Sequence, residues 1–407
     1  MRAKSEHIAH MDRHSPRFQG RSGESAPFCG VAVFCIPNRA LHGCQIGVHA
    51  AFLCRGGKER MFFMKKTVSS LLAAALCAAL LSSCAGGQEP SAPASSPQSS
   101  AAAPSSGEEG DGYYPVTLST YNGSKEPIEL TFEQAPEKVV CIWTNSVENM
   151  LALGLGDRIA LAAGVSPEEI LPEYQEELEK VDEIAPQYPP KEDIVALEPD
   201  FILGWYSTFS SDKYWGDTAF WNERGVNTYI SLNSGLIQPQ TVQNEFDDIL
   251  ALGEIFHVED KAQALVAEME ERLEAGRAYA EGKEPVRVLI LENEGDAFRN
   301  YGEDSIGGNI ASQVGAQICR ADSKTRLGAE DVLGENPDVL FAVHFGDEEG
   351  QRQCVADFTE NPAFSSLSAV QNGKVYPIDL SLIYSPGVRV SQSIDYFLEH
   401  LYPEMES

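Results

Sequence analysis

Aromatic and basic side chains that could contact a ligand follow several short apolar runs of the sequence. These candidates are Trp143, Trp205, Tyr206, Arg299, Tyr301, His344, Tyr384 and Arg389. Aromatic rings suit a large, partly planar ligand, and guanidinium groups can pair with carboxylate or catecholate oxygens. Residues 84–407 hold only 19 Lys and Arg against 57 Asp and Glu, so Arg299 and Arg389 stand out. The sequence therefore predicts a site for a large, partly planar or aryl-bearing ligand, with two guanidinium groups that could pair with anionic oxygens.

Each of these side chains also has a structural alternative. An aromatic ring that follows a buried strand packs in the core about as often as it contacts a ligand. For Arg389, a surface salt bridge is a serious alternative to ligand contact; for Arg299, the two roles are equally favoured. His344 could be an axial ligand of haem or cobalamin, although a single histidine is more often a hydrogen-bonded structural residue. Only His257 and His400 accompany it after Cys84, so we predict no site for a bare metal ion.

Charge and motifs exclude two other classes of function. The excess of acidic residues beyond residue 84 repels phosphate backbones, which argues against nucleic-acid binding. No Walker A loop, GxSxG elbow, HExxH motif or GxGxxG after a strand occurs. Carboxylates are plentiful, but their abundance does not make a paired acid–base site. We therefore predict that the chain is not an enzyme.

Two similar segments of sequence position the candidates. In residues 191–203 and again in residues 330–341, Glu-Asp is followed by two aliphatic residues, a Pro-Asp pair and an apolar run. Each pattern predicts a short helix, a stop and a buried strand. A repeat of this kind indicates two lobes of similar α/β architecture.

The remaining pattern alternates strands and helices on both sides of a long helix. Strands are predicted at residues 116–118, 128–132, 138–143, 159–163, 225–230, 286–291 and 374–378, and helices at 241–256, 258–280, 306–314 and 391–401. Asn122 and Gly123 are expected to form a hairpin turn, and Asn145 or Ser146 to cap a helix. The alternation predicts mainly parallel sheets, whose ligands bind beyond the carboxyl ends of the strands. By the register of the repeat, Tyr206 and His344 are expected to face each other across a cleft.

The first part of the sequence is typical of an exported protein. We interpret residues 1–60 as a start codon set too early or a disordered extension. After Met61 or Met64, two lysines precede an apolar run too short to span a bilayer, and Leu-Ser-Ser-Cys then ends at Cys84. Residues 61–83 are thus predicted to be a lipoprotein signal peptide and residues 84–112 a lipidated Cys with a flexible tether. A non-lipid signal peptide or a short buried helix are the alternatives.

These stretches together resemble the solute-binding proteins of ABC importers for iron–siderophores, haem and cobalamin, the helix-hinged class of periplasmic binding proteins. The resemblance is carried by residues 138–140, Glu148, 153–158, 192–200, 252–256 and 366–376. It runs from Tyr113 onward in the family's order, with Phe364 where many relatives have Trp. It implies two Rossmann-like lobes of mainly parallel sheet, residues 113–257 and 282–407, joined by a single long rigid helix at residues 258–281.

The resemblance also implies a function. A metal chelate would be captured between the lobes and delivered to an ABC permease and its ATPase. A ferric siderophore is the favoured ligand, haem and cobalamin stay open, and a surface sensor, an adhesin or an exported enzyme are the alternatives of other classes. Glu192 and Glu330 would dock on the permease through arginines, although both could simply complement helix dipoles. Lipid on Cys84 would hold a monomer, without intrinsic cofactor, on the outer face of the cytoplasmic membrane.

Overall fold

The computed structural model describes residues 112–210, 214–346 and 348–405. The predictions for the signal peptide, the tether and Cys84 therefore lie outside the described residues. The described chain begins with an antiparallel hairpin of β1 (Val116–Tyr121) and β2 (Pro127–Phe132). Asn122 starts its loop, because its side-chain oxygen accepts hydrogen bonds from the backbone N–H groups of Ser124 and Glu126, each at 2.9 Å.

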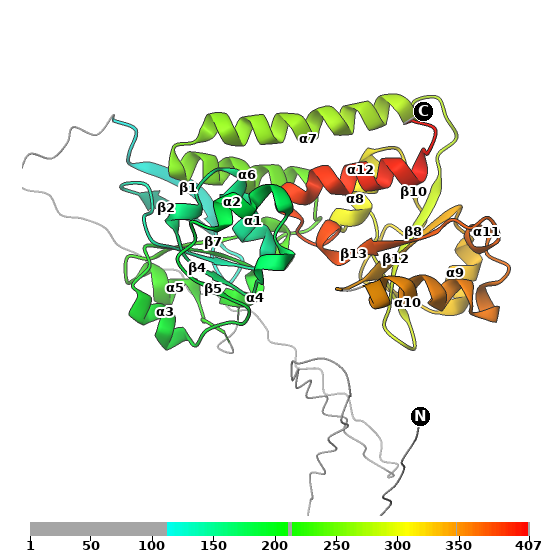
Figure 1. The fold of residues 1–407 in the computed structure, drawn as a ribbon, viewed down its shortest axis with the longest axis horizontal. Helices are drawn as coiled ribbons and strands as arrows, with labels where there is room; N and C mark the ends of the chain where they lie inside the picture. Colours follow the sequence, from blue (N-terminus) through cyan, green and yellow to red (C-terminus); the bar gives the residue numbers. More distant parts are fainter. Residues whose placement is uncertain (1–111, 211–213, 347, 406–407) are drawn as a thin grey trace, which may run out of the picture. The chain divides into compact units, whose positions relative to one another are not determined.

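The N-terminal lobe contains a parallel sheet with the strand order β5-β4-β3-β6-β7 (Figure 1). Its strands are β3 (Val139–Ile142), β4 (Ile159–Ala163), β5 (Ile184–Ala185), β6 (Phe201–Gly204) and β7 (Asn227–Ile230). Its short helices are α1 (Thr144–Ala152), α2 (Gln175–Leu178), α3 (Lys191–Leu197), α4 (Tyr206–Phe209) and α5 (Thr218–Asn222). Strands β3, β4 and β6 are buried along their whole length, as near-continuous apolar runs in a parallel sheet require.

The start of α1 differs from the prediction. The helix begins at Thr144, so the cap position belongs to Trp143, and neither Asn145 nor Ser146 caps it. The predicted cap was wrong because both residues lie inside the first turn. Asn145 instead uses its side chain for contacts with residues far away in the sequence, described below.

The C-terminal lobe contains a mixed sheet with the order β11-β9-β8-β12-β13, and β10 also pairs with β8. Its strands are β8 (Arg287–Asn293), β9 (Phe298–Asn300), β10 (Gln317–Ile318), β11 (Arg326–Leu327), β12 (Val339–His344) and β13 (Val375–Asp379). Its helices are α8 (Ile306–Gln313), α9 (Ala329–Glu335), α10 (Glu348–Thr359), α11 (Ser368–Gln371) and α12 (Val390–Leu401). The parallel pairing of β8, β12 and β13 confirms the predicted class, whereas the antiparallel β9 and β11 and the acidic helix α10 were not predicted.

Single helical turns fill several connections. They are 3-10 turns at Gly156–Arg158, Pro167–Glu169, Pro172–Tyr174, Pro362–Phe364, Leu380–Leu382 and Gly387–Arg389, and a π turn at Leu232–Leu236. Two of them, at residues 380–382 and 387–389, belong to the segment that enters the site described below.

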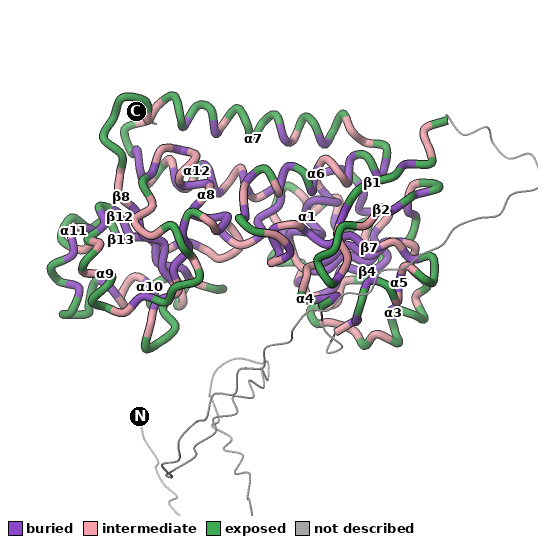
Figure 2. Tube along the Cα trace, turned by 180° about the vertical axis from the view of Figure 1, so that it is seen from behind, coloured by how far each residue is buried: buried purple, intermediate pink, exposed green. Residues whose placement is uncertain are grey.

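One long helix, α7 (Glu259–Ala280), connects the lobes and directly follows α6 (Val242–Phe256) of the N-terminal lobe. Helix α6 (Val242–Phe256) ends at His257 in the left-handed conformation, with a φ of 54°, and α7 (Glu259–Ala280) follows at once. Helix α7 packs against α6 and α12, with its buried residues spaced three or four apart (Figure 1). Much of the rest of α7 is exposed (Figure 2). Within the described ranges, no helix is long and apolar enough to cross a membrane.

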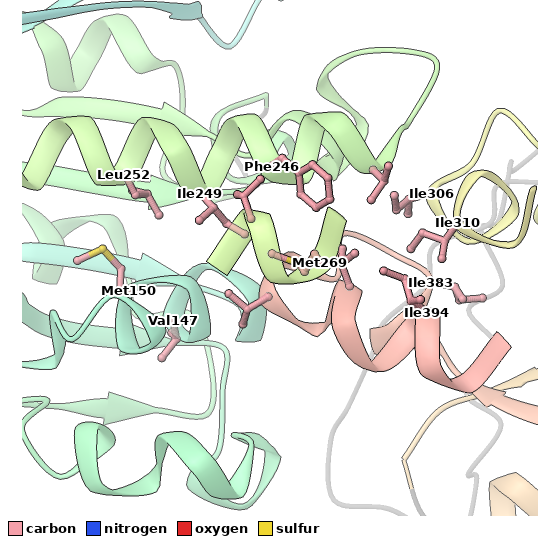
Figure 3. Close-up of a cluster of buried hydrophobic side chains, with 14 of the residues drawn as sticks. Val147, Met150, Phe246, Ile249, Leu252, Met269, Ile306, Ile310, Ile383 and Ile394 are labelled. Carbon is pink, nitrogen blue, oxygen red and sulfur yellow. The ribbon is translucent and has the colours of Figure 1, made fainter. Parts of the chain in front are cut away.

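The lobes share one hydrophobic core in addition to the connecting helix. Figure 3 shows this core running from α1 of the N-terminal lobe, along α6, to α8 and α12 of the C-terminal lobe. Labelled members are Val147, Met150, Phe246, Ile249, Leu252, Met269, Ile306, Ile310, Ile383 and Ile394. Movement of one lobe against the other must therefore disturb packed side chains as well as bend α7.

Candidate functional site

An open pocket of about 280 Å³ lies where strand ends of the two lobes meet. The N-terminal lobe contributes Trp143, Thr144, Asn145, Glu169 and Trp205, and the C-terminal lobe contributes Phe345, Gly346, Asp379, Leu380, Ser381, Tyr384, Ser385, Pro386 and Arg389. Trp143 follows β3, Trp205 follows β6 and Phe345 follows β12. The pocket therefore lies at the carboxyl ends of parallel strands, where open α/β sheets bind their ligands.

Three aromatic rings form a connected wall of the pocket. The ring centroids of Trp143 and Trp205 are 5.4 Å apart, and those of Trp205 and Tyr384 are 5.3 Å apart. Trp205 donates its indole N–H to Oδ1 of Asn145 at 2.7 Å, and Asn145 donates from Nδ2 to Oγ of Ser385 at 3.1 Å. Because Ser385 belongs to the C-terminal lobe, this chain of hydrogen bonds fixes the wall across the junction of the lobes.

Two residues of the pocket hold unusual backbone conformations. Trp143 has a φ of 69° and Ser385 a φ of 50°, in the region that side chains larger than glycine rarely adopt. Such positions cluster at ligand sites, where the surrounding structure keeps them in place. Their presence on both sides of the pocket identifies it as more than a surface irregularity.

The segment that carries Tyr384 and Arg389 is tied into the N-terminal lobe. The N–H of Gly387 donates to Oε2 of Glu245 at 2.8 Å, and the N–H of Val388 donates to Oδ1 of Asn149 at 2.9 Å. Gly387 has a φ of 58°, and a Cβ there would lie 2.4 Å from the Asn149 oxygen, so only glycine fits. Burial raises the pKa of Glu245 to about 7, against the opposing effect of its hydrogen bonds.

Arg389 lines the pocket, but its charge is already paired. Its Nε and Nη2 donate to the two carboxylate oxygens of Glu148 at 2.6 and 2.7 Å. Further bonds run from Nη2 to the carbonyl oxygen of Glu169 at 2.5 Å and from Nη1 to Oγ of Ser381 at 2.9 Å. Glu148 is fully buried and the Arg389 side chain is 12% exposed. Burial opposes the charged guanidinium, yet the bonds and charge of Glu148 prevail and raise the pKa of Arg389.

Arg299 and Tyr301 lie behind the pocket and do not line it. The Tyr301 side chain is buried and donates from its hydroxyl to Oε2 of Glu292 at 2.7 Å. Arg299 is 3.8 Å from the same carboxylate, and its guanidinium carbon is 5.8 Å from the ring centroid of Tyr384. In the structure Arg299 therefore lies beside an acidic side chain and Tyr301 packs in the core, the structural alternatives considered above. Ligand contact by either residue stays a prediction.

Tyr206 and His344 also lie outside the pocket lining. The ammonium nitrogen of Lys125 is 4.3 Å from the ring centroid of Tyr206. Nδ1 of His344 is 3.9 Å from Oδ2 of Asp379, and the His344 side chain is 10% exposed. The expectation that these two residues face each other across a cleft stays a prediction, because neither of them lines this pocket. Their chain neighbours Trp205 and Phe345 line it instead, because successive side chains after a strand point in different directions.

Several lining residues were not predicted. Phe345 is 56% exposed, an unusual position for a large apolar side chain, and this exposure is visible only in the folded chain. Asp379 ends β13 and accepts the backbone N–H of Ser381 at 2.8 Å. Glu169 comes from a loop, where no periodicity marks its position. Asn145 and Ser385 stand in the strand-end stretches, so position could have identified them although their residue types did not.

The two predicted docking glutamates are in equivalent, exposed places. Glu192 lies in the first turn of α3 and Glu330 in the first turn of α9. Among the described residues, neither takes part in a salt bridge, whereas the neighbouring Asp331 lies 3.8 Å from Arg320. Both carboxylates are therefore available to a partner.

Comparison with known proteins relates this architecture to one family. The model of the family described as periplasmic binding protein matches residues 139–382. The petrobactin-binding protein YclQ of Bacillus subtilis is 26% identical over 274 residues, covering 65% of this chain and 80% of YclQ. The uncharacterised ABC transporter substrate-binding lipoprotein YvrC of the same organism is 22% identical over 297 residues, covering 72% and 87%. A crystal structure of a periplasmic binding protein from Veillonella parvula superposes with a TM-score of 0.65 and 32% identity, covering 72% and 93%.

Proposed function

The chain belongs to the periplasmic binding protein family, and from that premise we propose that it captures a ferric siderophore and delivers it to an ABC permease. The observation that carries this proposal is the aromatic pocket at the strand ends of both lobes. Bulky chelates offer apolar linkers and aryl groups to Trp143, Trp205 and Tyr384, and polar oxygens to Asn145 and Ser385. Similarity to a petrobactin-binding protein supports the same class of ligand.

The pocket favours this class over haem and cobalamin bound through the metal. Its lining, among the described residues, includes no histidine, cysteine or methionine, and Tyr384 is the one lining side chain that could serve as an axial ligand of haem iron. His344 lies behind Asp379 instead. Haem, bound through Tyr384 or by contacts to the macrocycle, or cobalamin, bound by contacts to the macrocycle, is the second candidate, since the aromatic wall would also suit a flat ring system.

Fluorescence titration distinguishes the candidates. Of the four tryptophans, Trp143 and Trp205 line the pocket, whereas Trp215 and Trp221 are buried in the N-terminal lobe. We expect ferric siderophores to quench the emission in a saturable manner, and Trp205→Phe to reduce the amplitude more than Trp221→Phe does. Saturable quenching by haem or cobalamin, with none by any ferric siderophore, would contradict the proposed cargo.

We propose further that Glu192 and Glu330 dock on the permease. Exposure and equivalent placement at the starts of α3 and α9 support this role. A bidentate carboxylate–guanidinium pair at each lobe would orient the loaded protein on its partner. Uptake of labelled chelate by cells that lack the native gene and carry the variant tests this, and it also separates a transporter component from a sensor or adhesin.

We propose that lipid on Cys84 anchors a monomer to the outer face of the cytoplasmic membrane. The support is the order of lysines, apolar run, small residues and cysteine at residues 65–84. In the same proposal, residues 113–257 and 282–407 form the lobes and residues 258–281 the connection. Cys84→Ser is expected to abolish incorporation of labelled palmitate and to release the protein from membranes. Labelling of the variant at the wild-type level would contradict the anchor.

A further inference from the structure

The charges around the pocket restrict which chelate it accepts, provided that the proposed siderophore capture is correct. Among the described residues that line the pocket, three are charged: Glu169, Asp379 and Arg389. The fully buried carboxylate of Glu148 offsets the charge of Arg389 through two hydrogen bonds. Glu169 and Asp379 have no such partner, so the lining as a whole is acidic.

Arg389 is not free to turn towards an anionic ligand. Four of its five N–H groups are engaged, two by Glu148, one by the carbonyl oxygen of Glu169 and one by Ser381. Withdrawing the guanidinium would leave the carboxylate of Glu148 buried and unpaired, which is strongly unfavourable. The arginine therefore acts as part of the scaffold that joins the lobes.

The two other charges remain on the ligand side. Asp379 is 37% exposed, and its Oδ1 accepts one backbone bond from Ser381, while its Oδ2 is 3.9 Å from Nδ1 of His344. Glu169 is exposed and accepts one backbone bond, from Ser166 at 2.8 Å. Arg299, whose guanidinium carbon is 5.8 Å from the ring centroid of Tyr384, lies beside Glu292 and not in the lining.

We propose that this pocket selects iron(III) chelates that are uncharged or positively charged, such as trihydroxamates, and rejects anionic catecholate and carboxylate chelates. Hydroxamate complexes expose neutral carbonyl oxygens and methylene linkers. Asn145 and Ser385 can bond the former, and the rings of Trp143, Trp205 and Tyr384 can cover the latter. An anionic chelate would instead meet like charges, and the one cation among the described lining residues, Arg389, is already paired. This reverses the charge preference expected from the sequence.

A matched set of probes tests the inference by tryptophan quenching of the full chain. The set holds the metal constant and varies charge: iron(III) bound to desferrioxamine B is cationic, ferrichrome is neutral, and iron(III) enterobactin is a trianion. We expect the first two to bind on the order of tenfold or more tightly than the third. Added salt should weaken only the cationic complex. Equal or tighter binding of the trianion would overturn the charge selection and leave siderophore capture intact. Binding of none of the three, with binding of haem or cobalamin, would remove both proposals.

Substitutions of Asp379 and Glu169 test whether these two carboxylates cause the preference for uncharged or cationic chelates. Asp379→Asn and Glu169→Gln should lower the ratio of affinities for the cationic and the anionic complex, by about tenfold when combined. Glu360→Gln, which removes an exposed carboxylate just after α10, is the matched control and should keep the ratio of the wild type. Unfolding curves recorded alongside show that each variant is folded. A ratio that neither pocket variant changes would overturn the assignment.

Discussion

Each lobe contains a similar helix–strand unit: α3 and β6 in the N-terminal lobe, and α9 and β12 in the C-terminal lobe. The two units have the same backbone arrangement. Both helices end at a residue in the left-handed conformation, Glu198 with a φ of 53° and Asn336 with a φ of 44°. A Pro-Asp pair follows in each, and its aspartate binds the start of the adjacent strand. Asp200 accepts two backbone N–H groups, from Glu137 and Lys138, and Asp338 accepts one, from Arg287.

The two units differ at the ends that reach the ligand. Trp205 follows β6 and is held by Asn145, so the N-terminal lobe presents a wall that is ordered before any ligand arrives. Phe345 follows β12 and is more than half exposed. The repeat thus fixes the backbone and the placement of the two glutamates that we propose to dock on the permease, while the segments beyond the strands differ between the lobes. One end is held by a hydrogen bond, and we expect the other to gain contacts when a ligand covers it.

The largest effect is expected where the two units are most alike. Reversing charge with Glu192→Arg and Glu330→Arg together should abolish uptake and leave ligand affinity unchanged, because neither glutamate lines the pocket. Uptake of labelled chelate and tryptophan quenching measure the two properties separately. Glu360→Arg reverses an exposed charge elsewhere and should transport normally.

The single variants at these positions sharpen the comparison. Equal losses of uptake from Glu192→Arg and Glu330→Arg would mean that both lobes contribute equally to docking. A loss from only one would show that one lobe dominates. Normal uptake by the double variant would disprove docking through these residues.

The next effect concerns Glu148 and Arg389, the buried ion pair that links the two lobes in addition to their shared core. Glu148→Ala should destabilise the chain by about 3–5 kcal/mol, because it leaves the Arg389 guanidinium largely buried without its carboxylate. Urea unfolding measures the loss. Glu148→Leu combined with Arg389→Met removes both charges and should recover most of it. If Glu148→Ala unfolds at the urea concentration of the wild type, the pair does not join the lobes.

The sequence predicted most of the helices and strands but only part of the site, because local patterns mark the former and contacts between distant residues form the latter. Buried strands such as β3 and β12 are continuous apolar runs, and the Pro-Asp stops are local signals, so both can be recognised without a fold. The pairing of Arg389 with Glu148 joins residues 241 positions apart, and no local pattern contains it. The same holds for the Asn145 contact with Ser385 and for the exposure of Phe345. Short strands such as β11, two residues long, lack a period altogether.

A smaller effect is expected from the two Pro-Asp stops. Asp200→Ala removes two backbone hydrogen bonds to a charged group and should cost about 1.5–3 kcal/mol, whereas Asp338→Ala removes one and should cost less. Urea unfolding of both variants under the same conditions measures the difference. Equal losses would show that the number of bonds does not set the cost. The likeness of the α3–β6 and α9–β12 units would then depend on their shared backbone conformation and not on the number of aspartate hydrogen bonds.

The smallest effect tests the difference between the two ligand-side ends. Trp205→Phe keeps an aromatic ring but loses the 2.7 Å bond to Asn145, so about 1 kcal/mol of ligand affinity should be lost through a less ordered wall. Phe345→Leu keeps an apolar side chain without a ring and should cost a similar or smaller amount. The two variants should differ in which rate constant changes. Trp205→Phe should slow association, because the wall must become ordered during binding. Phe345→Leu should speed dissociation, because it removes a contact that is made only in the complex. Stopped-flow quenching with one chelate measures the two rate constants separately. If Phe345→Leu slowed association and Trp205→Phe sped dissociation, the side of the pocket formed by the C-terminal lobe would be the preorganised one.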